Sequence, residues 1–251
     1  MDAPPALNAP TALVMLIVVF ATAVKAALGF GFPLIAVPLA TLLLGPRTAV
    51  LLIAIPVVVT NFAILLRGGG TRADFRRFGG LLLAVVLGTV ASAPFLGRLD
   101  PELLTLVVGG TAIIFVALSF WDLVPDVPAQ VERYAGPSVG LFAGVVGGVT
   151  GIFAPPLAAY IHSLRVEKRV FVFWLTASFM LGGFTQAVSY YRLGLYDLRM
   201  FLYAVAACVP ALLGTRLGLW VQDRLPGGVF RRLVLILVLV TGISLVVQSL
   251  R

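Results

Sequence analysis

Charged residues are scarce in this sequence. Asp, Glu, Lys and Arg make up 11% of the 251 residues, against about a quarter in an average soluble domain. Hydrophobic residues reach 61% and the mean hydropathy is +1.10. Apolar runs of about 18 residues or more recur along the chain and leave only short polar connections. This composition leaves no room for a soluble domain and predicts an all-α polytopic membrane protein, with the lipid bilayer as a partner.

Cysteine and histidine are nearly absent. Cys208 is the single cysteine and His162 the single histidine, so the chain has neither an internal disulfide nor the Cys/His cluster of a thiolate metal site. We expect no metal and no cofactor. The 18 Lys and Arg exceed the 10 Asp and Glu, but they stand singly or in small groups at the ends of apolar runs. That placement is typical of topology signals and headgroup contacts, so no nucleic-acid partner is expected.

Acidic residues are missing from the interior of the apolar runs, since all ten Asp and Glu fall at their ends or between them. Cation pumps and proton antiporters usually keep an intramembrane carboxylate. The ionisable side chains inside the runs are instead Lys25, His162 and Arg216. Their sign favours a small anionic substrate. Equally, Lys25 and Arg216 could snorkel to an interface, and His162 could be a packing residue.

Two stretches interrupt apolar runs with glycine and proline. Gly29-Phe30-Gly31-Phe32-Pro33, followed by Pro38, lies in the run 13–44, and Gly147 to Pro156 lies in the run 138–164. Glycine frees the backbone and proline removes a donor, so a helix should break at each stretch. Paired broken helices are typical of the binding sites of transporters. The alternative is that these residues only allow close helix packing.

A half-helix that begins at Pro33 or Pro155 would turn free amides and its positive dipole end toward the break, which favours an anion. The candidate substrate-binding residues are Lys25, Gly29, Gly31, Phe32, Pro33, Asn61, Gly148, Thr150, Gly151, Pro155, His162 and Gln186. Asn61 and Gln186 can each donate to an oxygen-rich anion, although membrane amides also commonly join helices. No catalytic and no metal-binding residue is predicted.

The two halves of the chain carry similar features at an offset of about 120 to 126 residues. Thr60-Asn61 stands before Arg67 as Thr185-Gln186 stands before Arg192. The two breaks follow the same offset. Ordered matches of this kind favour an internal duplication. We predict about eight hydrophobic segments, with a first transmembrane repeat over residues 1–120, a linker over 121–137 and a second repeat over 138–251.

The distribution of Lys and Arg depends on whether the broken runs cross the membrane. If each run crosses, about eight basic residues lie on each side and give no orientation. If each run is a re-entrant hairpin, about eleven share one face against about five on the other. The positive-inside rule then makes the richer face cytoplasmic. Each half is left with three crossings, so the halves would be inverted copies, and we prefer this arrangement.

These features resemble the sulfite exporter TauE/SafE family of membrane transporters. The resemblance is carried by the stretch Gly29 to Pro38, by the stretch Gly147 to Pro156 after the central linker, and by duplicated helices along nearly the whole chain. The first break departs from the fuller glycine runs of the family, because aromatic residues stand between its glycines. The resemblance implies a multi-pass protein of the bacterial inner membrane that exports sulfite, sulfoacetate or another organosulfonate.

We expect alternating access, in which the two repeats rock around a central site. Amides at Gly31–Leu34 and Thr150–Pro155 would hold the anion's oxygens, and Lys25 would balance its charge. A membrane potential that is negative inside expels each negative charge with about 2.3 kcal/mol per 100 mV, so export needs no coupling ion. A passive anion channel and a non-transporting scaffold or assembly factor are alternatives. An intramembrane protease is not expected, because its sequence signatures are missing. A homo-oligomer is compatible with the sequence.

Overall fold

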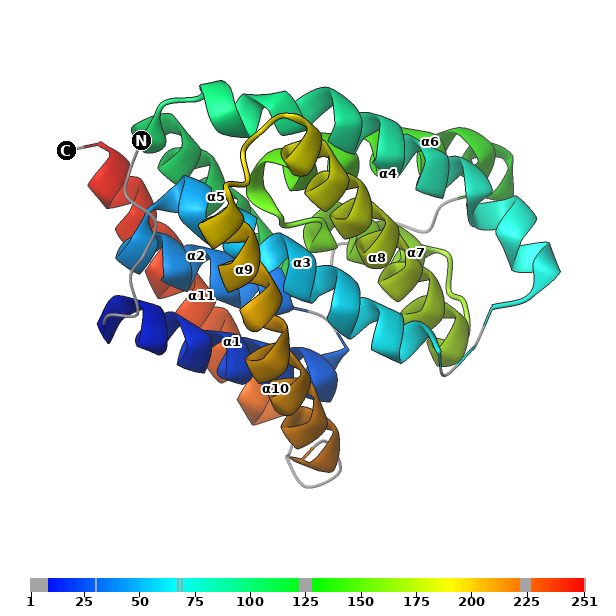
Figure 1. Ribbon diagram of the computed structural model, residues 1–251. Coiled ribbons are helices and arrows are strands. Elements are labelled where there is room, and N and C mark those ends of the chain that lie inside the picture. Colours follow the sequence, from blue (N-terminus) through cyan, green and yellow to red (C-terminus); the bar gives the residue numbers. More distant parts are fainter. Residues whose placement is uncertain are drawn as a thin grey trace.

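The computed structural model describes residues 9–29, 31–66, 68, 70–121, 128–221 and 227–250. All regular elements in these ranges are helices (Figure 1). In chain order they are α1 (Ala9–Leu28), α2 (Phe32–Leu44), α3 (Pro46–Leu65), α4 (Arg72–Arg98), α5 (Pro101–Trp121), α6 (Ala129–Thr150), α7 (Ala154–Ser163), α8 (Lys168–Arg192), α9 (Leu198–Ala206), α10 (Cys208–Val221) and α11 (Gly227–Ser249).

Seven segments of the described chain are long and apolar enough to cross a membrane: Thr11–Leu28, Pro46–Leu65, Asp74–Arg98, Pro101–Ser119, Lys168–Arg192, Leu198–Val221 and Arg232–Ser249. Many large apolar side chains on these segments are exposed on the outer surface of the bundle, as lipid contact requires. The prediction of an all-α polytopic membrane protein is confirmed.

Both glycine and proline stretches interrupt a helix. Gly29 and Gly31 have φ of 90° and 114°, and Gly151 has φ of 74°, values that residues with a Cβ rarely adopt. Prolines then stand in the first turn of α2 and of α7, where the missing N–H costs nothing. After each break the chain turns back, so that α1 lies against α2 and α6 lies against α7 (Figure 1). Phe30 lies outside the described residues.

Helices of the two predicted repeats are interleaved in space. Helix α1 packs on α10 and α6 packs on α4, while α3 lies against α8 and α5 against α11. Glycines allow the first two pairs to approach closely: a Cβ at Gly214 would lie 2.2 Å from the Val19 carbonyl oxygen, and one at Gly144 would lie 2.3 Å from that of Val85. Small residues serve this purpose in membrane helices. Corresponding helices thus take corresponding places, while the inverted duplication stays a prediction.

The interleaved helices form two clusters of buried apolar side chains. The larger draws mainly on α1, α2, α3, α5 and α11, and the smaller on α4, α6, α7 and α8. Each cluster therefore contains helices from both halves of the sequence. The two apolar clusters therefore do not coincide with the two sequence halves, and the rocking of the two repeats stays a prediction.

The hairpin topology places residues 67–77, 121–137, 165–169 and 223–232 on one face, and one end of the bundle gathers the described residues of the first three. Arg77 of α4 forms an ion pair with Glu132 of α6. Gly68, between α3 and α4, lies beside the Arg169 guanidinium, and Gly70 lies beside the Phe173 ring of α8. Residues 223–226 of the fourth segment lie outside the described residues. The described part of this end is rich in basic residues, as the hairpin topology expects of the cytoplasmic face.

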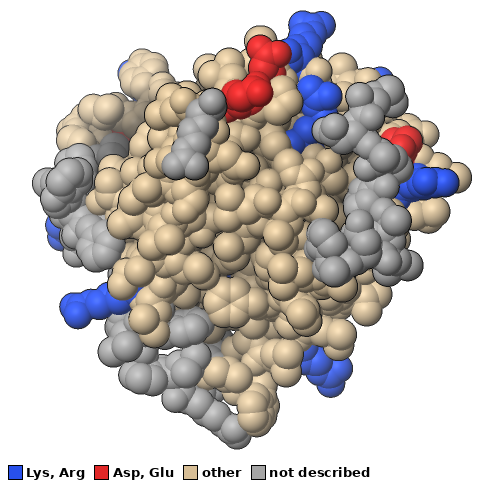
Figure 2. All heavy atoms as spheres, turned by 90° about the vertical axis from the view of Figure 1, so that its left-hand side faces the viewer, with Lys and Arg blue, Asp and Glu red and all other residues tan. Residues whose placement is uncertain are grey.

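Long-range hydrogen bonds close the opposite end. The Arg47 guanidinium donates to the carbonyl oxygens of Leu96 (3.1 Å) and Gly97 (3.0 Å). The Tyr196 hydroxyl donates to the Leu51 carbonyl oxygen at 2.7 Å, and burial raises the pKa of Tyr196. In Figure 2, which views the molecule from the left of Figure 1, charged side chains lie around the margin and the visible centre carries none.

Two helix boundaries have a local cause. Helices α9 and α10 are separated at Ala207, because Pro210 cannot donate to the carbonyl of Ala206 and its ring crowds that turn. Helix α6 begins at Ala129, inside the polar stretch 121–137 that we interpreted as a linker. Its first turns are polar because they reach the end of the bundle where Glu132 is paired. Residues 122–127 of the expected linker lie outside the described residues.

Candidate functional site

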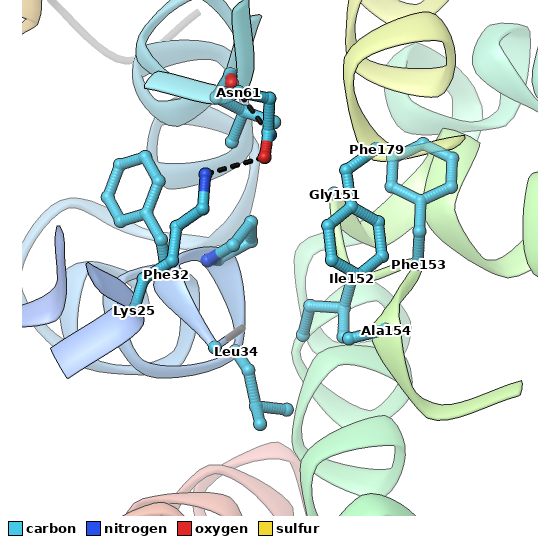
Figure 3. A pocket seen from close by; sticks show the side chains of 12 residues that line it. Lys25, Phe32, Leu34, Asn61, Gly151, Ile152, Phe153, Ala154 and Phe179 are labelled. Atoms are coloured by element: carbon cyan, nitrogen blue, oxygen red, sulfur yellow. Dashed lines mark hydrogen bonds between the residues drawn. The ribbon is translucent and has the colours of Figure 1, made fainter. Parts of the chain in front are cut away.

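A narrow cavity lies between the two helix breaks, where the two apolar clusters meet (Figure 3). Its lining residues are Lys25, Gly31, Phe32, Pro33, Leu34, Val57, Asn61, Gly151, Ile152, Phe153, Ala154 and Phe179. The space open to the centre of a water molecule is about 10 Å³, which is room for about one water. A larger guest can therefore enter only after the walls move apart.

Lys25 provides the charge of this cavity. It stands in the last turn of α1 and is only 2% exposed. Its Nζ donates to Asn61 Oδ1 at 2.6 Å and to Thr60 Oγ1 at 3.2 Å, both on α3. Within the described residues no carboxylate lies within ion-pair distance of Lys25. A buried ammonium is costly unless a counter-charge accompanies it, so the site has a positive charge that a bound anion would balance.

Asn61 is held in place from its own helix. Its Nδ2 donates to the Val57 carbonyl oxygen at 2.8 Å, which leaves Oδ1 directed toward Lys25. Thr60 is anchored in the same way, because its hydroxyl donates to the Pro56 carbonyl oxygen at 2.8 Å. The two acceptors therefore fix the position of the Lys25 ammonium before any ligand arrives.

Two helix N-termini border the cavity. Helix α2 begins after Gly31, and the amides of Phe32 and Leu34 precede the first intrahelical donor, Ile35, which donates to the Gly31 carbonyl oxygen at 3.1 Å. At α7 the amide of Ala154 is in the same position. Unsatisfied amides and the positive ends of helix dipoles attract anions. The Lys25 ammonium and the positive ends of both helix dipoles therefore all attract an anion into the cavity.

The two walls of the cavity differ in chemistry. In Figure 3, Lys25 and Asn61 lie on one side of the gap, and Ile152, Phe153 and Phe179 lie on the other. Every side chain that α7, α8 and the second break bring to the lining is apolar. The second wall can offer polar contacts only through its backbone.

Of the predicted site residues, Lys25, Gly31, Phe32, Pro33, Asn61 and Gly151 line the cavity. Gly29 and Pro155 belong to the breaks without lining it. Gly148 packs on α4, where a Cβ would lie 2.1 Å from Ser92 Oγ.

Gln186 and Thr150 close the last turn of α6. Gln186 Nε2 donates to the Gly147 carbonyl oxygen at 2.9 Å and contacts the Tyr190 hydroxyl at 2.8 Å. The Thr150 hydroxyl donates to the Val146 carbonyl oxygen at 2.8 Å. These side chains are therefore bonded to the backbone at the end of α6 and do not line the cavity.

The other two intramembrane cations lie outside the cavity. His162 is exposed on α7, and its ring contacts that of Phe171 edge-on at 6.3 Å between centroids. Arg216 is exposed on α10. The sequence showed the depth of these residues but not the direction in which each helix turns them. No group of three or more His, Cys, Asp or Glu that could hold a metal occurs in the described ranges.

Sequence reasoning included the amides of Leu34, Ile152, Phe153 and Ala154 but not their side chains, and it missed two lining residues, Val57 and Phe179. One signal was available for Phe179. It stands seven residues before Gln186 on α8, so the two share a helix face. Val57 stands four residues before Asn61 on α3, so the same kind of signal was available for it.

Comparison with known proteins gives one result. No curated protein and no solved structure matches the chain. The family model described as sulfite exporter TauE/SafE matches residues 14–245. The match contains both helix breaks and every residue that lines the cavity. The chain therefore belongs to the sulfite exporter TauE/SafE family of membrane transporters.

Proposed function

We propose that this protein is a secondary transporter that exports a small sulfur-containing anion across the bacterial inner membrane. The proposed substrate class is sulfite, which the family's description names, or sulfoacetate or another organosulfonate. The observation that carries the proposal is the Lys25 ammonium, buried between two helix breaks with neutral acceptors only. An oxyanion beside it would turn an unfavourable buried charge into a pair.

The oxygens of the substrate have several donors within the lining. The Lys25 ammonium has three N–H groups, and the amides of Phe32, Leu34 and Ala154 border the same space. A tetrahedral oxyanion head presents acceptors in several directions, which suits donors that converge from separate elements. Export then follows the membrane potential, which favours outward movement of a negative charge.

Alternating access is supported by the construction of the walls. The cavity is closed to anything larger than about one water, and its walls belong mostly to different apolar clusters. A relative rotation of the two clusters would open the cavity first to one side and then to the other. In this proposal the moving bodies are the two apolar clusters, each of which contains helices from both sequence halves.

The first test is ligand-dependent thermal stability of the purified protein in detergent. Sulfite, sulfate, sulfoacetate, taurine, acetate and chloride would each be titrated against the unmodified protein, Lys25→Ala and the control Arg216→Ala. Binding to the folded state raises the melting temperature by mass action. We expect a sulfur oxyanion or sulfonate to stabilise the unmodified protein and Arg216→Ala, but not Lys25→Ala. No response to any anion would instead support a scaffold.

The second test separates a transporter from a channel. Proteoliposomes loaded with unlabelled substrate would be diluted into labelled substrate, and uptake would be followed. A transporter that alternates gives a transient accumulation of label above equilibrium, and its flux saturates. Flux that stays proportional to concentration, without counterflow, would identify a passive anion channel.

A further inference from the structure

We infer that the transported anion has one charged oxyanion head and an apolar body, such as a short alkyl or aryl group, and that it is preferred over inorganic sulfite and over dianions. The inference rests on the proposed function, because it concerns the substrate of the same cavity. It follows from the difference between the two walls.

The charge of the lining favours a single negative head. Lys25 is the one charged side chain among the lining residues, and Asn61 is the one other polar side chain. Both lie on the same side of the cavity (Figure 3). A dianion such as sulfoacetate would have to place its second charge among apolar side chains, with only the Ala154 amide at the start of α7 to pair with it, and a poorly paired buried charge is disfavoured.

The opposite wall cannot turn a polar side chain toward the ligand. Gln186 and Thr150, the polar residues nearest to the second break, are already bonded to the carbonyl oxygens of α6. Inorganic sulfite carries oxygens around most of its surface, so some would face this wall without side-chain donors. An apolar body has no such requirement.

Phe153 and Phe179 make the apolar wall firm. The ring of Phe153 fills the space beside two glycines, since a Cβ at Gly147 would lie 2.2 Å from it and one at Gly182 would lie 2.8 Å from it. Phe179 is 7% exposed and belongs to the same apolar cluster. Rings that are packed from behind cannot rotate away, so they present a constant apolar surface to the ligand's body.

The test is a series of sulfonates with the same head and increasing apolar size: methanesulfonate, butane-1-sulfonate and benzenesulfonate, with sulfite and sulfoacetate for comparison. Thermal titration of the full-length protein in detergent gives an apparent dissociation constant for each. Each buried methylene should tighten binding about fourfold. We expect the butyl and phenyl compounds to bind at least about tenfold more tightly than methanesulfonate. Butan-1-ol and Lys25→Ala control for effects of the apolar group alone.

Two variants on α8 test whether the apolar wall of the cavity causes the preference for an apolar ligand body. Phe179→Ala should lose most of the preference for butane-1-sulfonate and leave methanesulfonate binding nearly unchanged. Phe184→Ala, on the same helix but 55% exposed on the outer surface, should keep the full preference.

The outcomes separate this inference from the proposed function. If sulfite, methanesulfonate or sulfoacetate binds as tightly as the larger sulfonates, the inference is overturned and anion transport stands. If none of the anions binds, the proposed function fails with it. The comparison within the series uses the unmodified protein, so it decides the question even if Phe179→Ala does not fold.

Discussion

The two helix breaks begin with the same backbone hydrogen bond but carry opposite chemistry. The Gly29 amide donates to the Lys25 carbonyl oxygen, and the Gly151 amide donates to that of Gly147, both at 2.7 Å. Lys25 and Gly147 therefore occupy equivalent places. Lys25 carries a long charged side chain at this place. Gly147 has no side chain, and the Phe153 ring fills the space next to it.

The side-chain amides next to the two breaks, Asn61 and Gln186, also form different hydrogen bonds. Asn61 accepts from the Lys25 side chain, whereas Gln186 donates to the Gly147 backbone. One amide thus orients a charge and the other completes a helix end. Two equivalent lysines would repel each other across a narrow cavity, so a duplicated framework with one charge provides a site with a defined polar and apolar side.

The largest effect is expected from removing the charge. Lys25→Met should weaken anion binding by more than about a hundredfold, because breaking a buried charge pair costs about 3 to 5 kcal/mol. Without ligand the variant should be more stable than the unmodified protein, since no ammonium is buried. Thermal titration measures both effects, with Arg216→Met as the control. Anion binding that survives in Lys25→Met would move the site elsewhere.

Introducing an acid at each amide should affect the two breaks differently. Asn61→Asp would place a carboxylate beside Lys25, so the internal pair should replace the anion and binding should fall about tenfold or more. Gln186→Glu would bury a carboxylate beside the Gly147 carbonyl, so stability should fall by several kcal/mol. Titrations of ligand and of denaturant on both variants measure the contrast. Equal loss of binding in both would mean that Gln186 also contacts the ligand.

Filling the glycine at the second break should destabilise the fold without touching the charge. Gly147→Ala would force the Phe153 ring to move, and overpacking of this kind costs about 1 to 3 kcal/mol. Gly110→Ala, where nothing lies within 4 Å of the added Cβ, should be neutral or slightly stabilising. The double variant Gly147→Ala, Phe153→Leu should regain part of the loss. A fully stable Gly147→Ala would show that the ring is free to rotate.

The smallest effect on stability is expected from cysteines that report sidedness. In a Cys208→Ser background, Lys168→Cys and Arg199→Cys place thiols at exposed positions on opposite ends, with changes in stability within about 0.5 kcal/mol. A membrane-impermeant maleimide should label Arg199→Cys in intact cells and Lys168→Cys only after lysis, because the end with Lys168 is the more basic one. The reverse labelling would reject the predicted orientation.

The positions of the breaks could be predicted from the sequence because their cause is local. Positive φ at Gly29, Gly31 and Gly151, and prolines in the turns that follow, depend on a few neighbouring residues. The sequence placed Lys25 inside a long apolar run but left open whether it is buried, since Arg216 lies in a similar run and is exposed. The helical type of the membrane-spanning segments followed from the length of such runs, whereas about eight segments were expected and seven are found in the described chain.

The contacts that make the site could not be predicted. Lys25 meets Asn61 across 36 positions, and nothing local brings α1 to α3. His162 stands beside the buried Ile161, yet a turn of about 100° per residue directs it outward. Phe153 and Phe179 belong to the most common residue class of the chain. Tertiary packing decides each of these three questions.

The pairing of α1 with α10 also determines when the native fold can form during synthesis of the chain. Helix α1 enters the membrane among the first segments, but the surface of Val19 and Ala23 is covered by Gly214 and Gly218, which leave the ribosome nearly two hundred residues later. Until then this surface must stay in contact with lipid or with the insertion machinery. The native fold therefore closes only near the end of translation, and premature termination before α10 leaves the helix that carries Lys25 without its partner.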